Sequence, residues 1–205
     1  GAKILIQNYS NLTLDNVELV GADVTQYVLS NNNGNTILTN DTTITAQDDN
    51  VAFDVYYWPG NGYESVTVEI ASNDVAITGR VEYASDGGEG FATNAKLIIP
   101  ADYELTAPAG YKWVAQEYKQ VLEAITYVAQ IGDVKYESLQ DAVNAVGEGG
   151  TITLLANASG DGVIAPENSS FTLDLGGHTY TVDGTLVGST GTETNGFQLL
   201  KGSTI

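Results

Sequence analysis

Short apolar runs separated by turn-forming residues cover the first 45 residues of the chain. Each run is three to five residues long, and Asn, Ser, Asp or Gly stands between it and the next. Strands of ordinary hairpin sandwiches average about five to six residues, so runs this short suit a coil that turns a corner and continues. The runs cover residues 3–7, 12–14, 17–20, 27–29, 36–39 and 43–45.

Alternating runs follow in residues 51–57, 66–70 and 75–83. Every second position is apolar, and this period of two places one set of side chains in a core and the other in water. We expect three neighbouring strands here. A β-sandwich presents such runs in the same way, and nothing local separates the two architectures.

The character of the sequence changes near Pro100 and Pro108. Residues 115–125 carry helix-forming side chains, whereas the alternation over residues 121–131 favours an extended strand. We favour the strand and interpret residues 116–127 as a join between two modules.

The second module opens with the clearest local signal in the chain. Residues 131–136 predict a strand, a tight turn and a strand, and Ser138 with Asp141 three residues later has the capping-box arrangement. Apolar side chains recur at helical spacing up to Gly147, which stands where a helix commonly ends in a left-handed residue. We therefore predict one short amphipathic helix over residues 138–146, followed by a series of strands. Its apolar positions are Leu139, Ala142, Val143 and Val146.

Three segments of this module, residues 128–143, 149–155 and 172–180, resemble the opening of right-handed parallel β-helix modules of large cell-surface proteins of gut bacteria. These modules share the pectate-lyase-like superfold, in which the short helix caps the first coil. The family commonly has Asn where Gly176 stands and Lys where His178 stands. The resemblance implies an all-β fold of right-handed parallel β-helix coils with one short capping α-helix. It also implies an extracellular setting at the bacterial cell surface, but no known activity.

The resemblance divides the chain into closing and opening coils. Residues 1–115 resemble the closing coils of a similar module, with residues 111–114 as its usual last strand, and residues 128–205 resemble opening coils. Either the chain straddles two consecutive modules of an array, or the halves stack so that residues 203–205 meet residues 3–7. Exposed strand edges attract pairing, so we expect edge-to-edge self-association in either arrangement.

Acidic residues dominate the charged positions. Lys and Arg total 7 against 26 Asp and Glu, a formal net charge of −19, and so negative a chain repels nucleic-acid phosphates and anionic membrane surfaces. No stretch is apolar over the length that membrane insertion requires, and the absence of cysteine excludes disulfides. No cofactor is predicted. Calcium held by Asp41, Asp48 and Asp49 is conceivable, but these acids lack the alternating pattern of a dedicated site.

Polysaccharide cleavage is the enzyme hypothesis, because the superfold hosts lyases and hydrolases. Asp54, Glu69, Arg80 and Glu82 fall on the polar face of the middle strands. Two carboxylates there could flank a glycosidic bond, with the one arginine as base or charge neutraliser. We favour the alternative that Arg80 forms a surface ion pair with Glu69 or Glu82, because a fold alone is no evidence for a site. The one histidine, His178, lacks a second His or a Cys with which to bind zinc and is interpreted as an outward corner residue.

Carbohydrate binding without cleavage fits the aromatic stretch at residues 56–63. Sugars stack their C–H faces on such rings, and alternation turns Tyr57 inward, which leaves Tyr56, Trp58 and Tyr63 for a ligand. An aromatic lid over the coil interior is the alternative use of these rings. We therefore predict a non-catalytic structural or adhesive module whose partner is a host or dietary glycan or a surface protein. A polysaccharide lyase or glycoside hydrolase is the second hypothesis.

Overall fold

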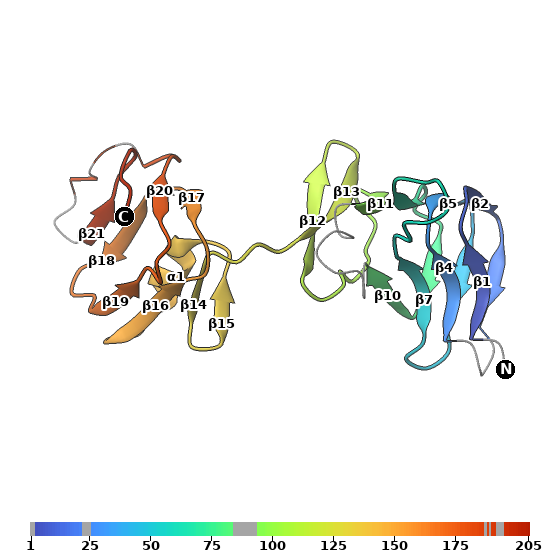
Figure 1. Ribbon diagram of the computed structural model, residues 1–205, viewed down its shortest axis with the longest axis horizontal. Helices are drawn as coiled ribbons and strands as arrows, with labels where there is room; N and C mark the ends of the chain where they lie inside the picture. Colours follow the sequence, from blue (N-terminus) through green and yellow to red (C-terminus); the bar gives the residue numbers. More distant parts are fainter. Residues whose placement is uncertain (1–2, 22–25, 84–93, 187, 189, 192–194) are drawn as a thin grey trace. The chain divides into compact units, whose positions relative to one another are not determined.

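The computed structural model describes residues 3–21, 26–83, 94–186, 188, 190–191 and 195–205 (Figure 1). Strands take up 49% of these residues and the one helix among them 4%, so the fold is all-β, as predicted. The chain forms two compact units, Gly1–Ala124 and Ile125–Ile205, and the boundary between them falls within the expected join. No helix in the described part of the chain has the length and apolar character needed to cross a membrane.

Strands in the first unit return to the same three sheets in rotation. Figure 1 labels several strands of the first two of these sheets. The first sheet contains β1 (Ile4–Asn8), β4 (Tyr27–Asn31), β7 (Val51–Val55) and β10 (Arg80–Tyr83). The second contains β2 (Leu12–Asp15), β5 (Gly34–Thr39), β8 (Val66–Ile70) and β11 (Ala95–Pro100), and the third contains β3 (Glu18–Val20), β6 (Thr43–Thr45) and β9 (Ala76–Thr78). Neighbours within each of these sets pair in parallel.

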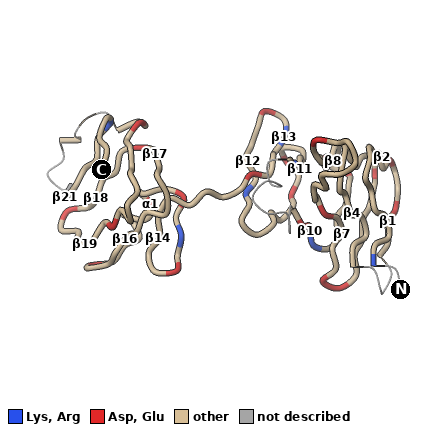
Figure 2. The backbone as a smooth tube through the Cα atoms, viewed as in Figure 1, with Lys and Arg blue, Asp and Glu red and all other residues tan. Residues whose placement is uncertain are grey.

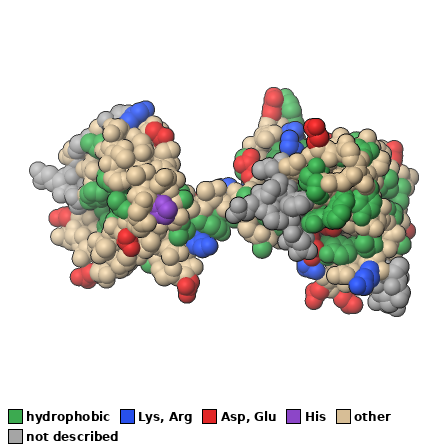
Figure 3. All heavy atoms as spheres, in the orientation of Figure 1, with side chains coloured by type: hydrophobic (Ala, Val, Ile, Leu, Met, Phe, Trp, Pro, Cys, Tyr) green, Lys and Arg blue, Asp and Glu red, His purple; other side chains and the backbone are tan. Residues whose placement is uncertain are grey.

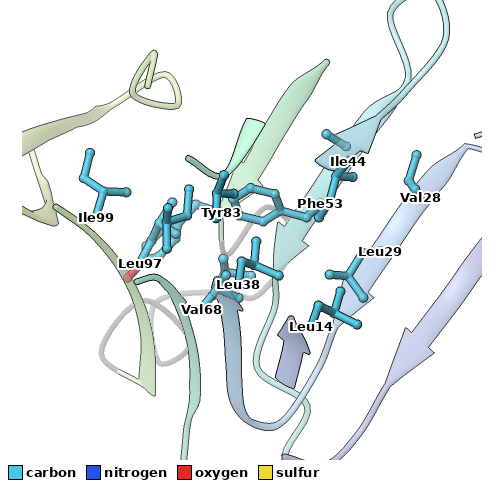
Figure 4. Packing of buried hydrophobic residues seen from close by; sticks show 14 of the residues in the cluster. Leu14, Val28, Leu29, Leu38, Ile44, Phe53, Val68, Tyr83, Leu97 and Ile99 are labelled. Carbon is cyan, nitrogen blue, oxygen red and sulfur yellow. The ribbon is translucent and has the colours of Figure 1, made fainter. Parts of the chain in front are cut away.

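Apolar side chains stack in register across each of the three sheets. The rows are Leu29–Phe53–Val81, Leu14–Leu38–Ile70 and Leu19–Ile44–Ile77. Their side chains belong to one core cluster, part of which is drawn in Figure 4. Because burying one such side chain completely contributes about 1.5–3 kcal/mol, these rows are the main stabilising feature of the first unit.

The three alternating runs do not form one set of neighbouring strands, contrary to expectation. Residues 75–83 are split at Gly79, which has a φ of 121° and separates β9 from β10. Only β10 lies beside β7, while β8 belongs to the second sheet and β9 to the third. Alternation determines which face of a strand is buried, but not which strand lies next to it.

An antiparallel hairpin extends the second sheet at the end of the first unit. β12 (Tyr111–Gln116) pairs with β13 (Lys119–Ala124), and β13 pairs with β11, so this sheet has six strands in the order β12-β13-β11-β8-β5-β2. The segment that carried both helix and strand signals is therefore extended, as its alternation favoured. The Trp113 indole N–H donates to the carbonyl of Leu105 over 2.7 Å, which ties the hairpin to the residues before it.

The second unit mixes parallel and antiparallel pairs. Its strands are β14 (Ala129–Ile131), β15 (Val134–Tyr136), β16 (Gly150–Leu154), β17 (Ala158–Gly160), β18 (Val163–Pro166), β19 (Phe171–Asp174), β20 (Tyr180–Val182) and β21 (Asn195–Leu199). The pairs β16–β19 and β17–β20 are parallel, whereas β14–β15, β14–β16 and β18–β21 are antiparallel. An isolated antiparallel bridge joins Thr204 to Thr181 of β20.

The predicted hairpin and helix are both present at the start of this unit. β14 and β15 form the hairpin, and the helix is α1 (Leu139–Ala145). Ser138 is its N-cap, and the Ser138 hydroxyl accepts a hydrogen bond of 3.1 Å from the N–H of Asp141. The helix ends differently from the prediction, because the chain leaves it in an extended conformation and Gly147 has no positive φ. The buried side chains of the helix are Leu139, Ala142 and Val143.

Candidate functional site

The loop between β7 and β8 presents an exposed tryptophan. Trp58 exposes 51% of its surface, whereas Tyr56 and Tyr63 in the same loop are half-buried. Gly60 lies against the indole, since a Cβ added at this glycine would come within 2.7 Å of the Trp58 Nε1 atom. The ring is thus folded back over its own loop, and the absence of a side chain at Gly60 leaves room for that position.

Hydrogen bonds to the turn between β4 and β5 hold the backbone at Trp58. Its N–H donates to the carbonyl of Asn32 over 2.9 Å, and the side-chain amide of Asn33 donates to the carbonyl of Trp58 over 2.7 Å. Asn33 is fully buried. The Oδ1 atoms of Asn32 and Asn33 are also buried and have no hydrogen-bond partner among the described residues. Hydrogen bonds to both its N–H and its C=O therefore fix the backbone of Trp58.

Two tyrosines brace the same loop from within. The Tyr57 hydroxyl donates to the carbonyl of Tyr63 over 3.0 Å, and the Tyr63 hydroxyl lies 2.9 Å from Oγ of Ser10. Tyr57 packs against the core, as its inward position in the alternation predicted. Of the three rings proposed as ligand contacts, Trp58 is the one that offers a large exposed surface, and Tyr63 serves the loop itself.

A polar row crosses the first sheet in register. It runs Gln7–Ser30–Asp54–Glu82 from β1 to β10. Asp54 is only 7% exposed; its carboxylate accepts hydrogen bonds from the Ser30 hydroxyl (3.1 Å) and from the Asn31 N–H (2.6 Å). Burial raises the pKa of Asp54 to about 7, and the negative charge of Glu82 adds to this effect.

Arg80 forms the ion pair that was the favoured alternative to a catalytic role. Its Nη1 lies 2.9 Å from Oε1 of Glu82, and its Nε donates to the carbonyl of Asp49 over 2.7 Å. The Tyr27 hydroxyl donates to the second carboxylate oxygen of Glu82 over 3.1 Å. Both the Arg80 guanidinium and the Glu82 carboxylate are therefore hydrogen-bonded to other groups of the first unit.

The four residues of the enzyme hypothesis are only partly brought together. Asp54, Arg80 and Glu82 lie on neighbouring strands of the first sheet, with Asp54 and Glu82 directly in register. Glu69 lies on β8 in the second sheet, where its register partners are Ile37 and Ile98. Asp54, Arg80 and Glu82 therefore share one sheet, and Glu69 lies in another.

A cavity of about 780 Å³ opens beside Arg80 and Glu82. Its walls come from the end of β9, from β10, and from residues 104–109 with Tyr111. Tyr83 and Tyr111 meet in this wall edge to face, with ring centroids 4.7 Å apart. The lining combines aliphatic and aromatic side chains with the carboxylates of Glu82 and Glu104.

Acidic residues outnumber basic residues in both units. Acidic residues are scattered along the backbone and basic ones are few (Figure 2). The described residues contain no group of three or more His, Cys, Asp or Glu side chains placed to hold a metal ion. Asp41, Asp48 and Asp49 are exposed, and the first two have positive φ values of 51° and 52°. Calcium binding by these residues stays a prediction.

Surface views locate the remaining candidates. Figure 3 shows hydrophobic side chains gathered on the visible face of the first unit, and the one histidine, in purple, at the surface of the second. That histidine, His178, follows a turn at Gly176 and Gly177, both of which have positive φ. It is half-buried, with the corner position that the sequence suggested.

Comparison with known proteins adds nothing to these assignments. No family model matches the chain, no curated protein matches it, and no solved structure matches it.

Several residues of the site carry no signal that sequence reasoning could use. Ser30, Asn31 and Tyr27 contact the acidic pair only because β4 lies in register beside β7 and near β10. Asn33 was notable in the sequence as part of an Asn-rich run, yet its contact with Trp58 joins residues 25 positions apart. Knowledge of the strand order would have been needed to find either contact.

Proposed function

We propose that this chain is a non-catalytic module of a bacterial cell-surface protein, structural or adhesive, that binds carbohydrate through Trp58. Its strands are assigned to coils of a right-handed parallel β-helix. The rotation of β1 to β11 through three sheets with parallel pairing supports that architecture in the first unit. The parallel pairs β16–β19 and β17–β20 support it in the second.

The extracellular setting rests on sequence features. The net charge of −19 favours solubility and disfavours nucleic acids and anionic membranes as partners. The segments near the start of the second unit resemble modules of gut-bacterial surface proteins. These features favour a host or dietary glycan, or a surface protein, as the partner.

The presentation of Trp58 is the observation that carries the carbohydrate proposal. A sugar ring stacks on an aromatic face that is exposed and already fixed in place, because little conformational entropy is then lost on binding. Trp58 exposes half of its surface while its peptide unit is held by Asn32 and Asn33. A tryptophan that closed the coil interior as a lid would instead be buried, as Phe53 is.

The proposal is tested by calorimetric titration with a panel of neutral and acidic polysaccharides, with and without calcium. Removing the ring in Trp58→Ala is expected to weaken binding about tenfold or more, since a stacked aromatic contributes about 0.5–1.5 kcal/mol beyond its buried area. Trp58→Tyr keeps a stacking face and is expected to retain most of the affinity.

Tyr118→Ala is the matched control for the loss of an exposed aromatic. Tyr118 is 80% exposed and lies in the turn between β12 and β13, away from the Trp58 loop. Its removal is expected to leave polysaccharide binding unchanged. Equal affinities of wild type and Trp58→Ala would refute the assignment of the ring to a ligand.

Polysaccharide cleavage is a second candidate function, favoured by one observation. Asp54 and Glu82 are carboxylic acids in register on adjacent strands, and their environments differ, with the pKa of Asp54 raised to about 7. The 780 Å³ cavity beside Arg80 and Glu82 could admit part of a chain. Against it, Asp54 is nearly inaccessible, and Ser30 and Asn31 already donate to its carboxylate.

Release of new reducing or unsaturated ends from the same polysaccharides separates the two functions. The proposed binding module releases none. Turnover that is lost in Arg80→Ala or Glu82→Gln, with binding retained, would make the chain an enzyme and overturn the first proposal.

A further inference from the structure

Among the described residues, the parallel part of the third sheet of the first unit has three strands, whereas the parallel part of each of the other two sheets has four. The first sheet continues from β7 to β10 and the second from β8 to β11, but in the described part of the chain the third ends at β9. The chain after β11 does run toward this side, because the Tyr103 hydroxyl donates to the carbonyl of Val75 over 2.9 Å. Residues 101–110 nevertheless form no strand beside β9.

The free edge of β9 is defined by its hydrogen bonds to the preceding coil. The Ala76 N–H donates to the carbonyl of Thr42 (2.9 Å), and the Ala46 N–H donates to the carbonyl of Thr78 (2.8 Å). Ala76 and Thr78 therefore direct their peptide groups toward β6. In a parallel sheet, the residue between them directs its N–H and C=O the opposite way. The N–H and C=O of Ile77 therefore point away from β6, toward the side that has no described strand partner.

The cavity lies at this edge. Ile77 of β9 and the following Gly79 belong to its lining, together with residues 80–83 of β10 and residues 104–109. A volume of about 780 Å³ exceeds what water alone needs and is in the range of sites that hold ligands. The space where a fourth strand of the third sheet would lie is thus open and walled.

We propose that an extended peptide segment of a partner protein binds here as a parallel fourth strand of the third sheet, by β-strand addition to β9. This mode of recognition takes affinity from main-chain hydrogen bonds and specificity from alternate side chains. It is independent of carbohydrate binding at Trp58, which uses a different loop.

The side-chain pattern of the segment follows from the sheet that it extends. Leu19, Ile44 and Ile77 are in register on successive strands and turn into the core. The next residue in this row must therefore be aliphatic. The two residues beside it point outward, where the third sheet has Thr43 and Thr45 on β6.

The charge of the cavity favours basic residues at the ends of the segment. Glu82 and Glu104 both line it, and the Arg80 guanidinium is already bound to Glu82 and to the carbonyl of Asp49. Glu104 is exposed and free of the Arg80 pair. A lysine flanking the aliphatic residue would gain a charge-assisted contact at low cost in desolvation.

The probe is the peptide acetyl-Lys-Thr-Ile-Thr-Lys-amide, titrated into the isotope-labelled full chain and followed by amide NMR signals. We expect saturable shifts centred on Ile77 and its neighbours. If about 1 mM peptide produces no such shifts, the dissociation constant is weaker than millimolar. That result overturns the proposal.

Two N-methylated peptides of identical composition test the strand pairing itself. In parallel pairing the N–H of the second threonine donates to the Ile77 carbonyl, whereas the N–H of the peptide isoleucine points away. N-methylation of that threonine is expected to weaken binding about tenfold or more, and N-methylation of the isoleucine to change it less than about twofold. Equal effects, or the reverse order, contradict a parallel fourth strand.

Variants of the chain test the charge argument. Glu104→Gln is expected to weaken the lysine peptide about threefold to fivefold and to reduce the dependence of binding on salt. Glu123→Gln, which removes an exposed carboxylate on β13, is the matched control and is expected to have no effect. Sedimentation of the free chain completes the test: a dimer that the peptide dissociates would place a second copy in the cavity and refute a separate partner.

Discussion

Both units build their sheets from short strands, but the strands pair differently in the two units. In the first, β1 to β11 rotate through three sheets, and each of three apolar rows runs unbroken across three strands. In the second, parallel pairs alternate with antiparallel ones and two of the sheets have only two strands. Strand length is similar in both units, so short strands alone do not determine parallel stacking.

Close packing against glycine, by contrast, is found in both units. A Cβ at Gly21 would lie 2.8 Å from a methyl of Val28, and one at Gly79 would lie 2.7 Å from Cβ of Ala46. Gly132, Gly149 and Gly177 of the second unit have open space at the same position. Gly110 of the first unit also has open space, whereas in the second unit a Cβ at Gly162 would clash with Leu186 and one at Gly160 would lie 2.8 Å from the Tyr180 hydroxyl. Glycines that permit close packing and glycines that serve local turns therefore occur in both units.

Removing the largest core side chain of the first unit is expected to have the largest effect. Phe53 is fully buried in the middle of its row, so Phe53→Ala should lower the free energy of unfolding by about 3–5 kcal/mol. Leu154→Ala makes the corresponding cavity in the second unit, where Leu154 is 2% exposed. In denaturant titrations we expect each variant to move a different transition; a common shift in both would show that the units unfold as one.

The buried Asp54 is expected to make the first unit less stable as pH rises. Its pKa is raised from 3.8 to about 7, so the folded state holds a proton that the unfolded chain releases, and stability is lost between about pH 4 and pH 7. Asp54→Asn keeps the shape of the protonated acid. We expect it to exceed wild type in the free energy of unfolding by about 2–4 kcal/mol at pH 8 and to match it near pH 4.

Asp48→Asn is the control for this pH dependence. Asp48 is exposed in a left-handed turn position that asparagine also adopts. Its substitution should leave the stability profile parallel to that of wild type from pH 4 to pH 8. A wild-type profile that rises over this range relative to that of Asp54→Asn would contradict burial of a neutral Asp54.

Two glycines of the first unit separate the cost of close packing from that of backbone strain, with a smaller expected effect. Gly79→Ala places a methyl group against Ala46 and forces a φ of 121° on alanine, and we expect a loss of about 2–3 kcal/mol. Gly110→Ala also requires a positive φ, of 84°, but meets open space, so a loss of about 1 kcal/mol is expected. Equal losses in thermal unfolding would mean that backbone strain, and not close packing against Ala46, determines the cost.

Local signals predicted the second unit best, while the order of the sheets could not be read from any of them. The hairpin at β14 and β15 and the cap at Ser138 depend on residues within a few positions of each other. The splitting of residues 75–83 between two sheets depends on the turn at Gly79 and on a partner, β6, more than 25 residues away. Period-two alternation contains no information about that partner.

The candidate site was predictable to the extent that it is local. The aromatic stretch marked the Trp58 loop. An ion pair of Arg80 with Glu69 or Glu82 was expected across strands, and the partner is Glu82, two positions away on the same strand. The separation of Glu69 from Asp54 and Glu82 was not foreseen, because a corner directs β8 into another sheet. The cavity beside β9 and β10 is lined by segments up to 34 positions apart in the sequence, and no local pattern of residues predicts it.

The cap of α1 gives the smallest expected effect and tests how local the second unit is. Ser138→Ala removes the acceptor for the Asp141 N–H and should cost about 1 kcal/mol, whereas Ser138→Asp supplies another acceptor and should cost little. Ser159→Ala, at an exposed position of β17, is the control for loss of a hydroxyl. Because α1 buries Leu139, Ala142 and Val143 in the core of this unit alone, the loss should appear only in the transition that Leu154→Ala moves. A shift of the Phe53→Ala transition instead would mean that the helix stabilises the first unit, and the units could then no longer be treated as separate folding bodies.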